Sequence, residues 1–270
     1  MSEPINFVIP KLMKYDLSLK TLITETDGEV EDCFVFKPGC KILRRTMNTL
    51  FTDKLYDQLH IDDCRPEYEQ NAEFGSRLTY LSFQNRETNS EEYNRKMVDD
   101  YGHLSIYGDY WVTFLLAGIT AETVLELVAH GEAKVNRLTT SKTKAMNETL
   151  YRVFGNEADA INEFRQLRDK YQDSDMFPDM ETFNMFNLGT KTLAMTFAMS
   201  LKDFHKFFIG RMTANNEREV REVAKLMCEQ LHRDYPLVIK DVEFYEKSSN
   251  HQKYAKPSAI ASDNCPQSAE

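Results

Sequence analysis

Apolar side chains recur at helical spacing along much of the C-terminal half of the chain. The clearest stripe occupies positions i, i+3, i+4, i+7 and i+11 and consists of Val220, Val223, Ala224, Met227 and Leu231. This periodicity predicts an amphipathic helix that begins after an N-cap at Asn216 and stops at Pro236. Residues 157–172 and 201–211 show similar spacing, and the second segment places three phenylalanines on one face. The C-terminal half is therefore predicted to be largely helical.

Earlier in the chain, two short segments have the composition of strands. Leu78–Phe83 and Tyr107–Leu116 are rich in aromatic and β-branched residues, which predicts a strand at each. The polar stretch 84–92 lies between them and leads into a predicted helix that ends near Tyr101.

The second of these strands is predicted to stop at Gly118, and Thr120 is predicted to cap a helix over 121–129. A further helix-like stretch covers residues 46–59. Helices and strands in this order predict an α+β fold.

The chain has 270 residues, which suits one large or two small domains. We expect a core over 76–245 and an N-terminal region, 1–75, of unclear role that packs on this core. Small, polar and proline-containing residues after about Tyr254 predict a flexible tail over 246–270.

Composition and charge exclude several classes of protein. The chain carries 33 Lys and Arg against 43 Asp and Glu, a net charge of −10, which argues against general binding to nucleic acid or to anionic membranes. It contains no apolar run of the ~18 residues that a membrane-spanning helix needs. The five cysteines are scattered, without the spacing of a metal site, and no secretory signal is visible. These features predict a cytoplasmic protein without a bound metal.

Three segments carry candidate binding chemistry. His103 and Ser105 precede the aromatic strand and are suited to ligand contacts, although a histidine that closes a turn is the more common reading. Residues 134–147 combine four cations with several hydroxyl groups and no acid, a set that suits a phosphate monoester as well as a solvated basic loop. Lys202 and Lys206 lie one helical turn apart, with Arg211 at the end of the same segment. These cations either clamp an anionic ligand or form a solvated face.

In order, these segments resemble the flavin-dependent thymidylate synthases over roughly Leu78 to Ile239. The resemblance rests on blocks that keep the family's order and spacing: Leu81-Ser82-Phe83, Gly102-His103-Leu104-Ser105, Trp111 to Thr120, Ala129-His130-Gly131, Asn136 with Thr139, Ser200 to Arg211, and Glu217 with Arg221. It implies the fold of that family, an α+β structure with a mixed sheet and long C-terminal helices.

The chain departs from the family at charged positions. The family's Arg-His-Arg signature reads Ala129-His130-Gly131, and the glutamine before it is Glu126. Each charge-assisted contact contributes about 1.5–3 kcal/mol, so losing these arginines weakens binding of the usual ligands. Arg137 and Lys142, which lie in the basic segment, are cations able to bind a phosphate from shifted positions.

The resemblance implies an activity: a reduced flavin passes a hydride, a folate donates a one-carbon unit, and dUMP is methylated at C5. Arg211 lies where the family's arginine activates the pyrimidine ring. Asn136 and Thr139 fall at the family's substrate positions, joined here by the cations Arg137 and Lys142. FAD binding is implied for Ser82, His103, Ser105, His130, Lys202 and Lys206.

The missing arginines leave a second reading open. In this reading the chain is a non-catalytic relative that keeps the scaffold as a nucleotide-binding or structural protein. The resemblance also implies a homotetramer. Four apolar side chains favour such an assembly if a single domain leaves them unburied: Leu115, Leu116, Val124 and Leu127.

Overall fold

The structure is a computed structural model, and the residues that it describes are 19–31, 34–46, 61, 65–84, 89–137, 152, 157–172 and 191–239. Most of the helix predicted over 46–59 lies outside these residues. So do the predicted ligand residues Thr139 and Lys142, and the predicted tail. The division at residues 75 and 245 stays a prediction, and helix α3 (Glu67–Tyr80) runs across the first of these boundaries.

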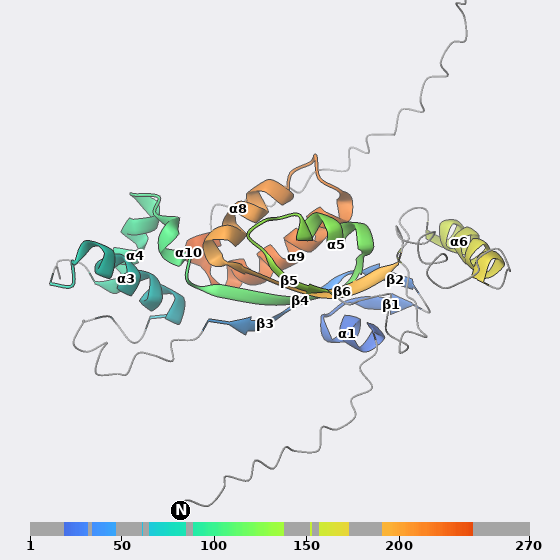
Figure 1. The fold of residues 1–270 in the computed structure, drawn as a ribbon, viewed down its shortest axis with the longest axis horizontal. Helices are drawn as coiled ribbons and strands as arrows, with labels where there is room; N and C mark the ends of the chain where they lie inside the picture. The colour runs from blue at the N-terminus through green and yellow to red at the C-terminus, as the bar shows by residue number, and fades with distance from the viewer. Residues whose placement is uncertain are drawn as a thin grey trace, which may run out of the picture.

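Helices cover both faces of a small central sheet (Figure 1). The elements in chain order are α1 (Leu19–Glu25), β1 (Glu29–Glu31), β2 (Phe34–Lys37), β3 (Gly39–Arg45), α3 (Glu67–Tyr80), α4 (Ser90–Asp99), the 3-10 helix η1 (Leu104–Tyr107), β4 (Trp111–Thr120), α5 (Ala121–Val128), β5 (Lys134–Arg137), α6 (Glu157–Gln172), β6 (Thr192–Ser200), α8 (Leu201–Arg211), α9 (Arg218–Asp234) and α10 (Pro236–Ile239). The predicted α+β class is confirmed.

Four strands form the central sheet in the order β3-β4-β6-β5, and β1 pairs separately with β2. Every pairing among the described strands is antiparallel, which corrects the expected mixed sheet. The long central pair runs from Trp111 opposite Ser200 to Thr120 opposite Thr192. The sequence pattern does not predict β6, because this strand is buried along most of its length and shows little polar alternation.

Gly118 lies inside β4, so the predicted break of this strand is wrong. The register between β4 and β6 shifts between Ala117 and Ile119. Gly118 has a φ of 73°, a left-handed conformation that glycine adopts without a steric penalty. The glycine therefore forms a bulge, and pairing continues beyond it.

Of the two segments predicted as strands, one is wrong and the other is largely confirmed. Leu78–Phe83 is not a strand: its first residues end α3, which is capped by Leu81 in a left-handed conformation. A short apolar run does not separate strand from helix, and α3 is stabilised by a buried ion pair one turn apart, with Arg77 Nε 2.7 Å from Glu73 Oε1. The other segment, Tyr107–Leu116, is confirmed as a strand from Trp111 onward, where β4 begins, whereas Tyr107 is the last residue of η1.

Several predicted helices are confirmed, with changes at their ends. Elements α5, α6, α8 and α9 occupy predicted segments. Thr120 caps α5 as predicted, because its Oγ1 accepts a hydrogen bond from the backbone N–H of Thr123 at 3.3 Å. Asn216 is not the N-cap of α9, since Glu217 occupies that position. Helix α9 ends before Pro236, as predicted.

The main core lies between one face of the sheet and helices α8 and α9 (Figure 1). Alternate residues of β4 are fully buried there, namely Val112, Phe114 and Leu116. Helix α8 contributes the predicted phenylalanines, and the rings of Phe114 and Phe204 meet edge-on with centroids 5.5 Å apart. Helix α1 covers part of the opposite face through Leu19 and Ile23.

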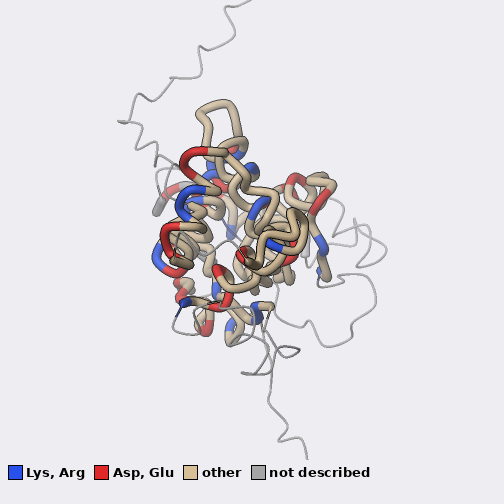
Figure 2. The backbone as a smooth tube through the Cα atoms, turned by 90° about the vertical axis from the view of Figure 1, so that its left-hand side faces the viewer, with Lys and Arg blue, Asp and Glu red and all other residues tan. Residues whose placement is uncertain are grey.

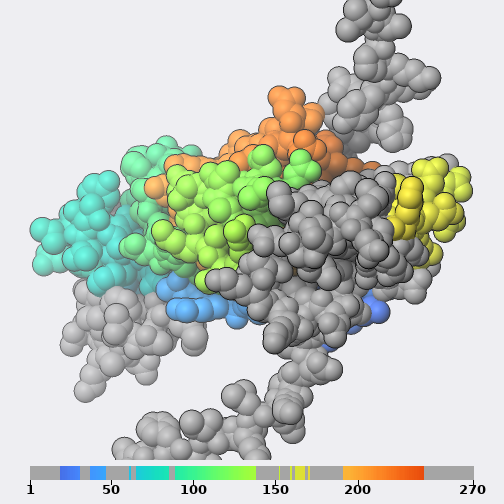
Figure 3. All heavy atoms as spheres, turned by 45° about the vertical axis from the view of Figure 1, so that its right-hand side comes forward, coloured from blue at the N-terminus to red at the C-terminus, as the bar shows by residue number. Residues whose placement is uncertain are grey.

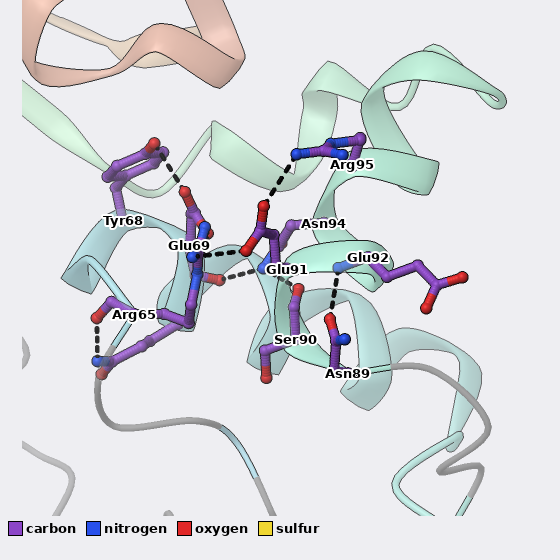
Figure 4. Close-up of polar contacts among 10 residues, drawn as sticks. Arg65, Tyr68, Glu69, Asn89, Ser90, Glu91, Glu92, Asn94 and Arg95 are labelled. Atoms are coloured by element: carbon purple, nitrogen blue, oxygen red, sulfur yellow. Dashed lines mark hydrogen bonds and ion pairs between the residues drawn. The ribbon is translucent and has the colours of Figure 1, made fainter.

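Helices α3 and α4 form a separate layer at one end of the sheet, joined by the polar contacts in Figure 4. The buried carboxylate of Glu69 accepts hydrogen bonds from Tyr68 Oη at 2.9 Å and Arg65 Nη2 at 2.6 Å. Arg65 also lies 3.1 Å from Glu91, and Asn94 Nδ2 donates to the backbone oxygen of Glu69 at 3.3 Å. Because α3 also packs against η1, this layer supports the segment that carries His103 and Ser105.

Basic and acidic positions are interspersed along the backbone in the view of Figure 2. Among the described residues, no helix is long and apolar enough to cross a membrane.

Candidate functional site

Arg211, the predicted catalytic residue, is the last residue of α8 and contacts two acceptors outside this helix. Its Nη1 donates to Glu126 Oε2 on α5 at 3.1 Å and to Asn216 Oδ1 at 3.3 Å. The surfaces of α5, in green, and of α8 and α9, in orange, meet in Figure 3. The Arg211 side chain is 23% exposed, so the guanidinium is anchored at a surface that a ligand can reach.

The loop between α8 and α9 fixes the orientation of Asn216. Its Nδ2 donates to the backbone oxygen of Gly210 at 2.8 Å and to Thr213 Oγ1 at 2.7 Å. Since the amide nitrogen donates to the end of α8 and to the loop after it, the amide oxygen faces Arg211. The side chain that the sequence pattern suggests as an N-cap therefore supports the guanidinium instead.

A buried carboxylate joins α5 to α9 beneath this surface. Glu219 Oε2 accepts hydrogen bonds from the backbone N–H of Thr120 at 3.1 Å, from Thr120 Oγ1, and from Thr123 Oγ1 at 2.6 Å. Its Oε1 lies 3.2 Å from Arg152 Nη1, and Arg152 Nη2 donates to Glu222 at 2.6 Å. A carboxylate at the N-terminus of α5 is also favoured by the helix dipole. This cluster holds α5, which carries Glu126, against the start of α9.

His130 lies in the turn after α5 and packs against α8. Its ring meets Phe207 edge-on with centroids 5.2 Å apart, and its Nε2 lies 3.7 Å from Glu132 Oε2. Ala129 and Gly131 on either side are exposed. The two positions that carry arginine in the resembling family therefore supply no charge here.

The residues proposed for the cofactor near η1 differ in their surroundings. Ser82 Oγ is buried and has no hydrogen-bond partner among the described residues, while its backbone oxygen accepts from Arg77 Nη1 at 3.2 Å. The exposed ring of His103 stacks on Tyr101 with centroids 5.8 Å apart. Ser105 is exposed within η1. Ser82 thus offers a buried hydroxyl, whereas the other two side chains face solvent.

The remaining predicted residues lie on α8, which also carries Arg211, and on β5. Lys202 is half-buried and Lys206 exposed on α8, away from its buried phenylalanines. The basic segment 134–147 is not wholly a loop, because its first four residues form the edge strand β5. On this strand Asn136 Nδ2 donates to Thr196 Oγ1 at 3.3 Å, and Arg137 is exposed. The structure therefore distributes the predicted residues over three parts of the fold.

A cavity of about 220 Å³ lies away from these residues, between β3 and the C-terminal half of α9. It is lined by Thr26, Asp27, Pro38, Cys40, Leu226, Glu229, Gln230 and Arg233. Burial raises the pKa of the Cys40 thiol to about 12, so this cysteine is unreactive at neutral pH.

Burial also lowers the pKa of Lys191, at the start of β6. No group of His, Cys, Asp and Glu among the described residues is arranged to hold a metal ion.

The residues that organise the site are not apparent from the sequence. Glu126 stands out only as a departure from the family, and Asn216 as a helix cap. Glu219 is visible only as an acid in the first turn of a helix, and its partner Arg152 has no distinguishing pattern. Contacts between positions so far apart in the chain leave no trace in a single sequence.

Comparison with known proteins shows likeness in fold. No protein-family model matches the chain, and no curated protein matches it in sequence. Two solved structures of the flavin-dependent thymidylate synthase ThyX from Helicobacter pylori, both with FAD and dUMP, are similar to it. The first has a TM-score of 0.54 at 12% sequence identity, and the alignment covers 75% of this chain and 97% of the ThyX chain. The second has a TM-score of 0.50 at 14% sequence identity, and the alignment covers 67% of this chain and 98% of the ThyX chain. The chain therefore has a ThyX-like scaffold.

Proposed function

We propose that this protein binds a pyrimidine nucleotide on its ThyX-like scaffold and, with a flavin, transfers a one-carbon unit to C5 of the base. One observation carries the proposal. Arg211, to which the family resemblance assigns the activating role, is a partly exposed and anchored guanidinium at the end of α8, on a fold that spans nearly the whole of ThyX.

Arg211 acts as a hydrogen-bond donor to a carbonyl oxygen of the pyrimidine. Attack at the ring gathers negative charge on this oxygen, and a positioned donor stabilises that charge. Removing such a donor typically costs ~10²–10³ in rate. The nucleotide phosphate would be met by Asn136 and Arg137 on β5, together with Thr139 and Lys142.

The residues proposed for FAD fit its diphosphate in donor chemistry. Lys202 and Lys206 are two cations one turn apart on the solvent side of α8, and Ser82 Oγ is a buried hydroxyl with no partner among the described residues. His103, Ser105 and His130 complete the proposed set. When bound, the flavin supplies the hydride, and a folate would supply the carbon.

A second candidate function is nucleotide binding without turnover. The observation in its favour is the loss of charge beside His130, where Ala129 and Gly131 stand in place of arginines. A scaffold that keeps Arg211 and the cations of β5 would still bind a nucleotide after losing the flavin.

The purified protein distinguishes these functions. The enzymatic proposal predicts a visible flavin spectrum or saturable uptake of added FAD, dUMP binding by calorimetry, and rescue of a thymidine-requiring bacterium that is lost in Arg211→Ala. Saturable dUMP binding without flavin uptake or rescue would favour the binding protein. A folded protein that takes up neither FAD nor dUMP contradicts both.

We also propose a homotetramer, on the resemblance alone. Three of the four apolar side chains expected to need an assembly for burial, Leu116, Val124 and Leu127, are fully buried within the single chain, and Leu115 is half-buried. Other apolar side chains remain exposed, including Leu125 and Ile209, and a self-association surface is consistent with them. Light scattering after size exclusion tests the assembly, and a monomer at micromolar concentration would contradict it.

A further inference from the structure

The guanidinium of Arg211 is held by hydrogen bonds at Nη1 only, so the side formed by Nε and Nη2 has no partner among the described residues. Nη1 carries two hydrogens, and its two acceptors are Glu126 Oε2 at 3.1 Å and Asn216 Oδ1 at 3.3 Å. Among the described residues Nε and Nη2 make no hydrogen bond, and neither is a buried atom. The donors of Nε and Nη2 point along one edge of the guanidinium as a parallel fork.

We propose that Glu126 and Asn216 are positioning residues, which hold Nη1 so that the Nε and Nη2 fork of Arg211 faces a carbonyl oxygen of a ligand. The inference rests on the proposed function, in which that ligand is a pyrimidine nucleotide. A carbonyl oxygen of the pyrimidine base has two lone pairs and can accept a hydrogen bond from each donor of the fork.

The two positioning residues are themselves held. Asn216 is oriented by Gly210 and Thr213. Glu126 is on α5, and the buried Glu219 fixes the start of this helix against α9. An arginine side chain free to rotate loses conformational entropy when it meets a ligand, and these contacts remove much of that loss in advance.

A matched set of substitutions separates position from charge. Glu126→Gln removes the charge but keeps an oxygen that accepts from Nη1, whereas Glu126→Ala removes both. Glu122→Gln is the control, because this exposed carboxylate of the same helix undergoes the same charge change. Asn216→Ala tests the second acceptor.

The first measurement needs no ligand. In side-chain ¹⁵N spectra of the full chain, assigned with Arg211→Lys, we expect slowed rotation about the Nε–Cζ bond of Arg211. It should persist in Glu126→Gln and Glu122→Gln and be lost in Glu126→Ala and Asn216→Ala. Rapid rotation in the unmodified protein, or unchanged slow rotation in both alanine variants, would overturn the proposal.

The second measurement is dUMP titration by calorimetry. We expect Glu126→Ala to bind dUMP roughly tenfold more weakly than Glu126→Gln, the effect of one charge-assisted contact, with no such difference in an Arg211→Ala background. Equal affinity of the two variants would refute the positioning role. If the unmodified protein binds no dUMP, the proposed function fails, and the rotation measurement alone decides the positioning of Arg211.

Discussion

The buried carboxylate of Glu219 is expected to be a major source of stability in this fold. Glu219→Ala removes the acceptor of Thr120 and Thr123 and one partner of Arg152, whose side chain is 2% exposed. Breaking one side of a buried ion pair costs about 3–5 kcal/mol. Arg152 keeps Glu222 at 2.6 Å, so the lower part of this range applies, and we expect a loss of about 3–4 kcal/mol.

Urea unfolding followed by far-UV circular dichroism measures this loss, and the midpoint of thermal unfolding should fall by roughly 6–16 °C. Glu222→Gln is the control. Its carboxylate is 33% exposed and also contacts Arg152, so we expect a loss of about 1 kcal/mol or less. If Glu219→Ala lowers the free energy of unfolding by less than about 1 kcal/mol, or by no more than Glu222→Gln does, Glu219 does not stabilise the packing of α5 against α9.

Three further substitutions or treatments test the fold. Gly39→Ala should lower the free energy of unfolding by about 1–3 kcal/mol, as measured by urea unfolding, because a Cβ there would lie 2.5 Å from the backbone oxygen of Thr26. An unchanged midpoint of unfolding would contradict this packing. Asn89→Ala should cost about 1 kcal/mol, since its Oδ1 accepts from the first turn of α4 at 2.8 Å (Figure 4); the same unfolding assay with an exposed Asn→Ala control measures it. Cys40 and Cys228 should resist alkylation at pH 8 until the protein unfolds, as peptide mass spectrometry would show, because burial raises the pKa of each thiol from 9.0 to about 12. Between these two pKa values, the thiol has lost its proton in the unfolded state and keeps it in the folded state. The free energy of unfolding should therefore fall as pH rises, by about 1.4 kcal/mol per pH unit for each thiol. Cys→Ala variants should lose part of this pH dependence.

Patterns within one element predicted the fold well where one side of that element faces solvent. The stripe that contains Val223 and Met227 predicted α9, because its buried face repeats at helical spacing. Strand β6 has no comparable pattern, since both of its faces are largely covered. The short apolar run at Leu78 suggests a strand but forms the end of a helix, because its helical state depends on α3 as a whole, including the ion pair of Glu73 with Arg77.

The candidate site was less predictable, for a physical reason. Its contacts join positions far apart in the chain, as Glu126 and Arg211 do across 85 residues. Either residue alone reads as a solvated charge on a helix. The resemblance to a family supplied Arg211, but the partners of Arg211 follow from how α5 and the loop after α8 meet in space.

These partners give a physical account of the two main departures from the family. The family's glutamine and two arginines together bring two positive charges to the signature, whereas Glu126, Ala129 and Gly131 bring one negative charge. A carboxylate at this place needs a cation, and Arg211 supplies it at 3.1 Å. The surroundings of Arg211 are therefore poorly suited to a phosphate and better suited to the neutral base of a nucleotide. In the proposed function, the nucleotide phosphate would then be met by cations elsewhere, such as Arg137 on β5.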